Sequence, residues 1–263
     1  MNNVLVGRRS EQTAVFGSLA AVTAIAWILT VQLTAGMTMS TGPTDMASAM
    51  PSAGHQLLLA SAMWAAMMVG MMVPSAVPMV LTFTDWTRRG PGGGSRIVAV
   101  TSFLAGYLLV WLGFSALAAV LQVTLQDAGL LAATGAIGRP ALAGTLLVLV
   151  GLFQLTSWKE SCLRRCRTPV GFLVAEWRDG ATGALVMGVR HGTYCLGCCW
   201  VLMTVLFVVG TMHLAWAAAI GVFVLAEKVA PKSLPVSQVA AVVLVGWGAW
   251  TLWGAWTLLG AGI

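Results

Sequence analysis

Charged side chains are scarce in this sequence. Of 263 residues, 14 are Lys or Arg and 8 are Asp or Glu, so charged residues make up 8% of the chain and hydrophobic residues 59%. A soluble domain usually carries about 25% charged residues. This scarcity, with a mean hydropathy of +0.89, excludes a soluble catalytic domain and predicts a polytopic membrane protein. The net charge of +6 then concerns orientation in the membrane and does not indicate a nucleic-acid partner.

Acidic residues and enzyme motifs are also missing from the apolar stretches. No Asp or Glu lies well inside a stretch long enough to span a membrane, and Glu227 and Lys228 stand at the end of one. Proton relays across membranes usually need intramembrane carboxylates, which argues against a proton-coupled carrier. The chain has no phosphate-binding loop, no Ser, His and Asp set and no paired carboxylates that suit catalysis. We therefore expect neither an ATP-driven pump nor an enzyme, and we predict no catalytic residue.

Seven stretches contain the roughly 20 mainly apolar residues that a spanning helix needs. They are 13–34, 55–81, 97–121, 140–158, 192–210, 213–229 and 236–260. We predict an all-α fold, a transmembrane bundle of about seven helices in a single integral membrane domain over residues 1–263. With seven crossings, every Lys and Arg except Arg139 falls in linkers on one side. Because basic linkers stay in the cytoplasm, we predict a cytoplasmic N-terminus, in a bacterial cytoplasmic membrane.

Two linkers differ from the others in composition. The outer linker 35–54 is rich in methionine and leads into a histidine. Its methionines and that histidine are Met37, Met39, Met46, Met50 and His55. The inner linker 159–190 is the longest and the most basic, and we expect part of it to form an interfacial helix on the inner leaflet.

The five cysteines lie in the middle of the chain, in an odd number that does not indicate a disulfide framework. Three follow a histidine closely, and on a helix His191, Cys195, Cys198 and Cys199 would share a stripe about 100° wide. Thiols and an imidazole are costly to leave unpaired in an apolar setting, and thiolates bind Cu(I) and Zn(II) well. The stripe predicts a soft-metal site at the cytoplasmic end of the fifth predicted helix.

Two further cysteines, Cys162 and Cys166, lie four residues apart in the inner linker. They are in the same predicted compartment as the stripe and are candidates to complete the metal site. The alternative is a structural role, because buried cysteines also act as small hydrophobic residues.

Methionine gives a second signal, since ten of the 14 methionines lie between residues 37 and 79. Met63, Met67 and Met71 would cover about 80° of one helix. A thioether is a soft, neutral ligand that holds Cu(I) without adding charge in lipid, although methionine is also an adaptable filler of apolar helices. We predict that the outer residues collect the ion and that Met63, Met67 and Met71 relay it inward. The outer residues are Met37, Met39, Met46, Met50 and His55. Pro74 and Pro78 are expected to break this helix near its inner end.

Two blocks of the chain resemble a bacterial family of predicted metal-binding integral membrane proteins, a domain of unknown function whose members are sometimes labelled copper chaperones. The resemblance covers roughly residues 55–231. The first block is Met63-Trp64 through Met67, Met71-Met72, Pro74-Ser75 and Pro78-Met79. The second and more specific block runs from Cys162 and Cys166 through Trp177-Arg178-x-Gly180 and His191-Gly-x-Tyr194-Cys195-x-Gly197-Cys198-Cys199-Trp200 to Glu227-Lys228-x-x-Pro231. The resemblance implies metal binding and brings no particular reaction with it.

The leading functional hypothesis is a membrane protein that binds a soft metal ion, Cu(I) in preference to Zn(II). It would pass the ion to an apo-metalloprotein, to a membrane complex or across the bilayer, from thioether sites to tighter thiolate sites. Two alternatives stay open. One is a membrane thiol oxidoreductase that uses the Cys195 and Cys198 pair, and the other is a structural or assembly subunit of a membrane complex.

Overall fold

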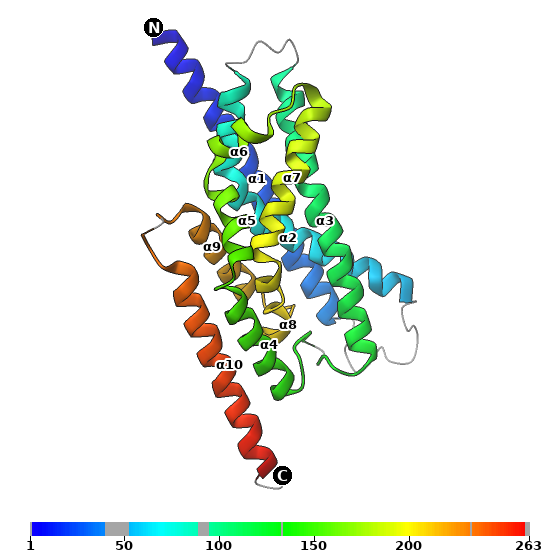
Figure 1. Ribbon diagram of the computed structural model, residues 1–263. Coiled ribbons are helices and arrows are strands. Elements are labelled where there is room, and N and C mark those ends of the chain that lie inside the picture. Colours follow the sequence, from blue (N-terminus) through cyan, green and yellow to red (C-terminus); the bar gives the residue numbers. More distant parts are fainter. Residues whose placement is uncertain (1, 40–52, 89–94, 133, 232, 261–263) are drawn as a thin grey trace. The chain divides into compact units, whose positions relative to one another are not determined.

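The computed structural model describes residues 2–39, 53–88, 95–132, 134–231 and 233–260 (Figure 1). Within these ranges the backbone is helical almost throughout, and the one extended pairing is an isolated bridge between Leu131 and Ile137. The apolar stretches fold as helices because a helix satisfies its own backbone hydrogen bonds where no water is present. The all-α fold that the sequence predicts is confirmed.

The chain divides into two compact units. Unit 1 comprises Met1–Ala116 and Arg165–Tyr194, and unit 2 comprises Leu117–Arg164 and Cys195–Ile263. The helices are α1 (Asn2–Met39), α2 (Ala53–Thr87), α3 (Arg96–Asp127), α4 (Pro140–Phe153), α5 (Ser157–Arg167), α6 (Pro169–Glu176), α7 (Gly180–Met203), α8 (Leu206–Val209), α9 (Leu214–Val229) and α10 (Val236–Gly260). The helices α3, α5 and α7 contribute residues to both units.

Unit 1 contains a close contact between α3 and α7 that depends on glycine. A Cβ atom on Gly106 would overlap the backbone of Leu185, and one on Gly188 would overlap the backbone of Phe103. Small residues commonly allow membrane helices to approach at this distance. The approach brings the aromatic side chains of α3 beside the part of α7 that carries His191.

Helix α2 contacts both α1 and the short α6. The Trp27 ring of α1 lies against Gly70 of α2, where a Cβ atom would come within 3.1 Å of the indole nitrogen. The side of α2 that is covered in this way is the one on which the sequence places its methionine stripe.

Unit 2 contains two further close approaches. Along the α4 and α10 pair, a Cβ atom on Gly248 would lie 2.7 Å from the carbonyl oxygen of Gly144. Helix α5 approaches α7 at Gly197, where a Cβ atom would lie 2.8 Å from Cys162 Sγ. A glycine between the second and third predicted ligands of α7 therefore lets a cysteine of α5 reach that helix.

Five helices in the described part of the chain are long and apolar enough to cross a membrane. They cover Gln12–Gly36, Gly54–Thr87, Arg96–Asp127, Gly180–Val209 and Val236–Thr257. The pair Pro140–Phe153 and Ser157–Arg167, bent by 60°, would make a sixth if it is counted as one span. The stretch predicted at 213–229 forms α9, whose 16 residues extend about 24 Å against a hydrocarbon thickness of about 30 Å. The predicted number of about seven spans is not confirmed.

The helix predicted at 192–210 begins earlier than the sequence indicates. Helix α7 starts at Gly180, whose φ of 79° suits glycine, so most of α5, all of α6 and the start of α7 occupy the predicted inner linker 159–190. The sequence analysis ended the inner linker at Arg190, a charged residue, and began the next predicted helix after it. In the structure it lies on the exposed side of α7 and pairs with Glu176 of α6, so the helix continues past it.

The prediction that Pro74 and Pro78 break α2 was wrong, because the helix runs through both residues. The hydroxyl groups of Ser75 and Tyr107 both donate hydrogen bonds to the Met72 carbonyl oxygen, at 2.8 Å and 3.0 Å. These bonds do not replace the ones that the prolines remove, since Pro74 and Pro78 leave the carbonyl groups of Gly70 and Pro74 without their i+4 donors. Helix α2 is continuous all the same. The methionine stripe therefore stays on one continuous helix.

We expect Gly106→Ala to destabilise the protein by about 2 kcal/mol, because the added methyl group would collide with the Leu185 backbone, which cannot rotate away. Gly113→Ala is the matched control, since it lies in the same helix with nothing within 4 Å of an added Cβ atom. Thermal unfolding of both variants in detergent provides the measurement. Equal midpoints for the two variants would contradict the close approach of α3 and α7.

Candidate metal-binding site

The four predicted ligands of α7 all face the interior. Cys195 and Cys199 are 0% exposed, His191 is 1% exposed and Cys198 is 2% exposed. A helix surrounded by lipid on all sides would expose some of these side chains. The stripe that the sequence predicts is thus a buried face of the helix.

Cys195, Cys198 and Cys199 form a sulfur cluster in unit 2. The thiols of Cys198 and Cys199 each donate to the Cys195 carbonyl oxygen at 3.0 Å. The Cys199 side chain also has hydrogen-bonding interactions with the side chains of Cys195 and Cys198. No disulfide involves any of the five cysteines, so all of them retain a sulfur that can act as a soft donor.

Lys228 adds a positive charge to the sulfur cluster. Its Nζ, from the last turn of α9, donates to Cys195 Sγ at 3.0 Å, and the residue is 7% exposed. A charge buried in this way needs a compensating partner, because transfer of an ion out of water is costly. The sulfur of Cys195 is suited to that role as a thiolate. The sequence analysis assigned Lys228 no part in the metal site and placed it at the inner end of a predicted helix.

His191 has aromatic surroundings in unit 1. Its ring centroid lies 5.3 Å from that of Phe172 in α6, and 5.8 Å and 6.0 Å from those of Tyr107 and Phe103 in α3. The close approach of α3 and α7 at Gly106 and Gly188 produces this arrangement. Sequence spacing alone placed the imidazole with the thiols and did not indicate the rings that enclose it.

Cys162 and Cys166 lie one turn apart in α5 and belong to different units. Cys162 is half-buried, and its sulfur lies against Gly197 of α7. Cys166 is buried and belongs to unit 1. The structure thus brings Cys162 to the segment of α7 that carries the sulfur cluster. The part of both cysteines in the metal site stays a prediction.

The methionine stripe is buried along its length. Met63, Met67 and Met71 are at most 2% exposed. Met68 and Met72, on a different side of the helix, are buried as well. Burial on both sides shows that this part of α2 is surrounded by protein, so the stripe is one part of a wider layer of methionine side chains.

The outer residues predicted to collect the ion lie mostly outside the described side chains. Met37 and Met39 are in the last turn of α1, and the structure describes only their backbone. Met46 and Met50 fall in residues 40–52, which are not described. His55 is in the first turn of α2 with its side chain exposed.

No group of three or more His, Cys, Asp or Glu side chains is arranged to hold a metal ion in the part of the chain that the structure describes. The burial of the α7 stripe and the contact of Cys162 with α7 agree with the sequence-based site. Coordination by these residues stays a prediction.

The sequence analysis missed a buried ion pair in unit 2. Lys159 Nζ of α5 lies 2.6 Å from Glu227 Oε1 of α9, and both residues are 1% exposed. Ser237 Oγ donates to the same carboxylate oxygen at 2.7 Å, and Lys159 also donates to the side-chain oxygen of Gln154. Glu227 lies in the last turn of α9, at the helix end where the sequence analysis placed it, but its burial and its partner were not predicted. The available signal was the position of Glu227 and Lys228 within the block that resembles the metal-binding family.

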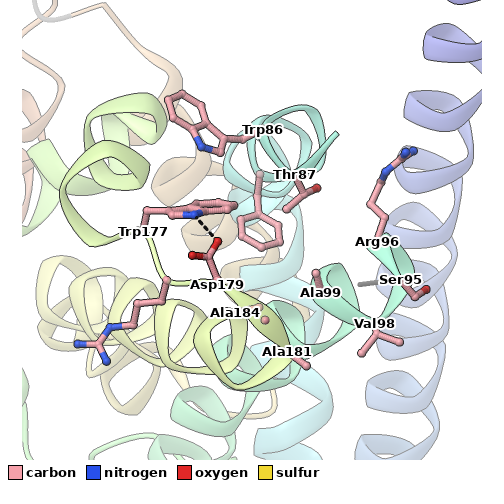
Figure 2. A pocket seen from close by; sticks show the side chains of 13 residues that line it. Trp86, Thr87, Ser95, Arg96, Val98, Ala99, Trp177, Asp179, Ala181 and Ala184 are labelled. Atoms are coloured by element: carbon pink, nitrogen blue, oxygen red, sulfur yellow. Dashed lines mark hydrogen bonds between the residues drawn. The ribbon is translucent and has the colours of Figure 1, made fainter. Parts of the chain in front are cut away.

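Two cavities contain none of the predicted ligands. One, of about 350 Å³, lies in unit 1 where α2 ends and α3 and α7 begin. Figure 2 shows Trp86, Trp177 and Arg96 around it, with the Trp177 indole donating to Asp179 at 3.0 Å. The other, of about 600 Å³, is an apolar groove in unit 2 beside Trp216 and Trp247. Neither lining offers a set of soft ligands, so we place no metal there.

Comparison with known proteins identifies a family. The family model described as a copper chaperone, PpoB2, matches residues 61–251. The matched region contains the methionine stripe, the sulfur cluster and Lys228. No curated protein and no solved structure matches the chain. The resemblance to a family labelled copper chaperone, drawn from the sequence, is confirmed.

Removal of one partner of the buried ion pair is expected to cost about 3–5 kcal/mol of folding stability, because the remaining charge is left uncompensated. This applies to Lys159→Met and to Glu227→Leu. The double variant, which removes both charges, should be more stable than either single variant. Thermal unfolding of the wild type and the three variants tests the coupling. A double variant whose loss equals the sum of the two single losses would show that the pair does not interact.

Proposed function

The chain belongs to the copper chaperone family, and from this premise we propose that it is an integral membrane protein that binds Cu(I) and passes it to an acceptor protein or across the membrane. The family description supports copper as the cargo, and the long apolar helices support insertion in a bilayer. Trp250, Trp253 and Trp256 on α10 are exposed, which suits the interface between lipid and water.

The sulfur cluster is the observation that carries this proposal. Three buried cysteines on two successive turns of α7 can provide thiolates, the ligand type that Cu(I) prefers. Cys162 supports the site as a further sulfur because it lies against Gly197, between Cys195 and Cys198. When the ion binds, metal–sulfur bonds replace the hydrogen bonds from Cys198 and Cys199 to the Cys195 carbonyl oxygen, and the thiol protons leave to solvent.

His191 and Cys166 enter the proposal from helical spacing alone. His191 is one turn from Cys195 in α7, and Cys166 is one turn from Cys162 in α5. Three aromatic rings lie within about 6 Å of the His191 ring, and imidazole is a common metal ligand. We propose His191 as a ligand of a passing ion and the sulfur cluster as the site that retains it.

The methionine stripe is proposed as the route by which the ion enters. Met63, Met67 and Met71 are buried in a continuous helix, and thioethers hold Cu(I) without adding negative charge. The outer residues Met37, Met39 and His55 are proposed to collect the ion from solution. Methionine ligands also favour Cu(I) over Zn(II), because zinc sites use Cys, His and carboxylates.

We propose that the N-terminus is cytoplasmic and that the bent pair of α4 and α5, together with α9, completes seven crossings. The distribution of the basic residues supports this orientation, since Arg139 alone would face outward. The proposed location is a bacterial cytoplasmic membrane, where free thiols on the inner side are stable.

Reporter fusions test the orientation. A reporter that is active only in the cytoplasm should be active when it is joined to the N-terminus and inactive when it is joined to the C-terminus. A reporter that folds only outside the membrane should show the opposite pattern. Both ends on one side of the membrane would rule out an odd number of crossings.

Metal analysis of the purified protein tests the function. After loading with Cu(I) under reducing conditions, the wild type should retain copper. The triple variant Cys195→Ser, Cys198→Ser, Cys199→Ser should lose at least about nine-tenths of it, since a hydroxyl is a poor ligand for a soft ion. Mass spectrometry of bound metal gives the amount per protein. No copper in the wild type, or equal amounts in both proteins, would contradict the proposal.

A second triple variant, Met63→Leu, Met67→Leu, Met71→Leu, separates entry from retention in the same experiment. Leucine is similar in volume to methionine and usually costs little stability in a core. This variant should retain copper when the purified protein is loaded in detergent, and it should load more slowly when copper is offered to sealed vesicles.

A further inference from the structure

We infer that Lys228 makes the sulfur cluster selective for monovalent over divalent thiophilic ions. This inference rests on the proposed function, since it assigns a role to a residue that contacts a proposed ligand. Lys228 is not a metal ligand itself. It would act through its charge on whichever ion the cysteines hold.

The position of Lys228 is set by its hydrogen bond to Cys195 and by its place at the end of α9. Its Nζ donates to Cys195 Sγ at 3.0 Å, and it stands in the last turn of α9, where the carbonyl groups at the end of the helix favour a cation. A metal bound to a cysteine lies about 2.3 Å from the sulfur. An ion held by Cys195 is therefore a close neighbour of the ammonium group.

The other buried charges of unit 2 pair with each other, and Lys228 donates its hydrogen bond to a cysteine. Among the described residues, the buried Lys and Glu side chains are Lys159, Glu227 and Lys228, two positive and one negative. Lys159 and Glu227 compensate each other at 2.6 Å. The buried Lys and Glu charges of unit 2 then sum to +1, and the sulfur that accepts the hydrogen bond of Lys228 is that of Cys195.

The selectivity follows from how Coulomb repulsion scales with charge. The ammonium group of Lys228 repels a divalent ion twice as strongly as a monovalent ion at the same position, and burial leaves this repulsion poorly screened. The thiolates attract both ions, and their number is the same with or without Lys228. For a given set of thiolates, Lys228 therefore lowers the affinity for Zn(II) more than the affinity for Cu(I).

Competition between the purified protein and chelators of known affinity measures the Kd for Cu(I), under reducing conditions, and for Zn(II). Lys228→Gln and Lys228→Leu remove the charge, with a polar and an apolar side chain respectively, and Lys228→Arg retains it. We expect both neutral variants to shift the ratio of the two Kd values toward Zn(II) by at least about tenfold. Lys228→Arg should stay close to the wild type.

The outcomes separate this inference from the proposed function. A wild type that binds no Cu(I) overturns the proposed function, and the inference with it. A wild type that binds Cu(I), with the same ratio in both neutral variants, overturns the inference alone. A shift in Lys228→Arg as large as in Lys228→Gln would show that packing and not charge sets the ratio. Thermal unfolding of each variant confirms that the proteins compared are folded.

Discussion

The contact between the Lys228 ammonium group and the Cys195 sulfur is the interaction on which the proposed site depends. In a chain with so few charged residues, a buried cation needs a partner inside the protein, and the partner here is a cysteine of another helix. Glu227, the residue before Lys228 in α9, forms an ion pair with Lys159 of α5. Ser237 of α10 donates a hydrogen bond to the same carboxylate. Four helices of unit 2 thus meet through a few polar groups that have little contact with water.

Glycine permits the sulfur groups to gather. Gly197 lets Cys162 of α5 reach α7, and a side chain at this position would displace the Cys162 sulfur. In unit 1, Gly106 and Gly188 bring α3 against α7 in the same way, so that Tyr107 lies beside His191. The hydrophobic effect does not drive helices together in lipid, because lipid tails are as apolar as the helix surfaces. Close backbone approach supplies the packing, and the polar and sulfur side chains then determine which helices pair.

The sequence predicted the parts of this structure that depend on local pattern. Runs of apolar residues predicted helices, and the spacing of Cys195, Cys198 and Cys199 predicted a shared face, because both follow from the geometry of one helix. The partners of that face were not predictable in the same way. Lys228 and Cys195 are separated by 33 residues, and Lys159 and Glu227 by 68, so their contacts depend on tertiary packing. For the same reason charge alone placed Arg190 at a helix boundary, whereas pairing with Glu176 allows it to stay within α7.

The positive charge beside the sulfur cluster also bears on how tightly such a site holds its cargo. Lys228 has two opposing effects, because an ammonium group stabilises the thiolates that bind the ion and at the same time repels the ion itself. A storage site gains from the first effect alone. A site that must release its ion to an acceptor gains from both, since the thiolates are ready before the ion arrives and the repulsion favours its transfer. The methionine stripe consists of neutral thioethers, which in the proposed route would hold Cu(I) weakly. A delivery protein needs two kinds of site. Neutral ligands that bind the ion weakly let it enter, and thiolates beside a cation hold it with an affinity low enough for release.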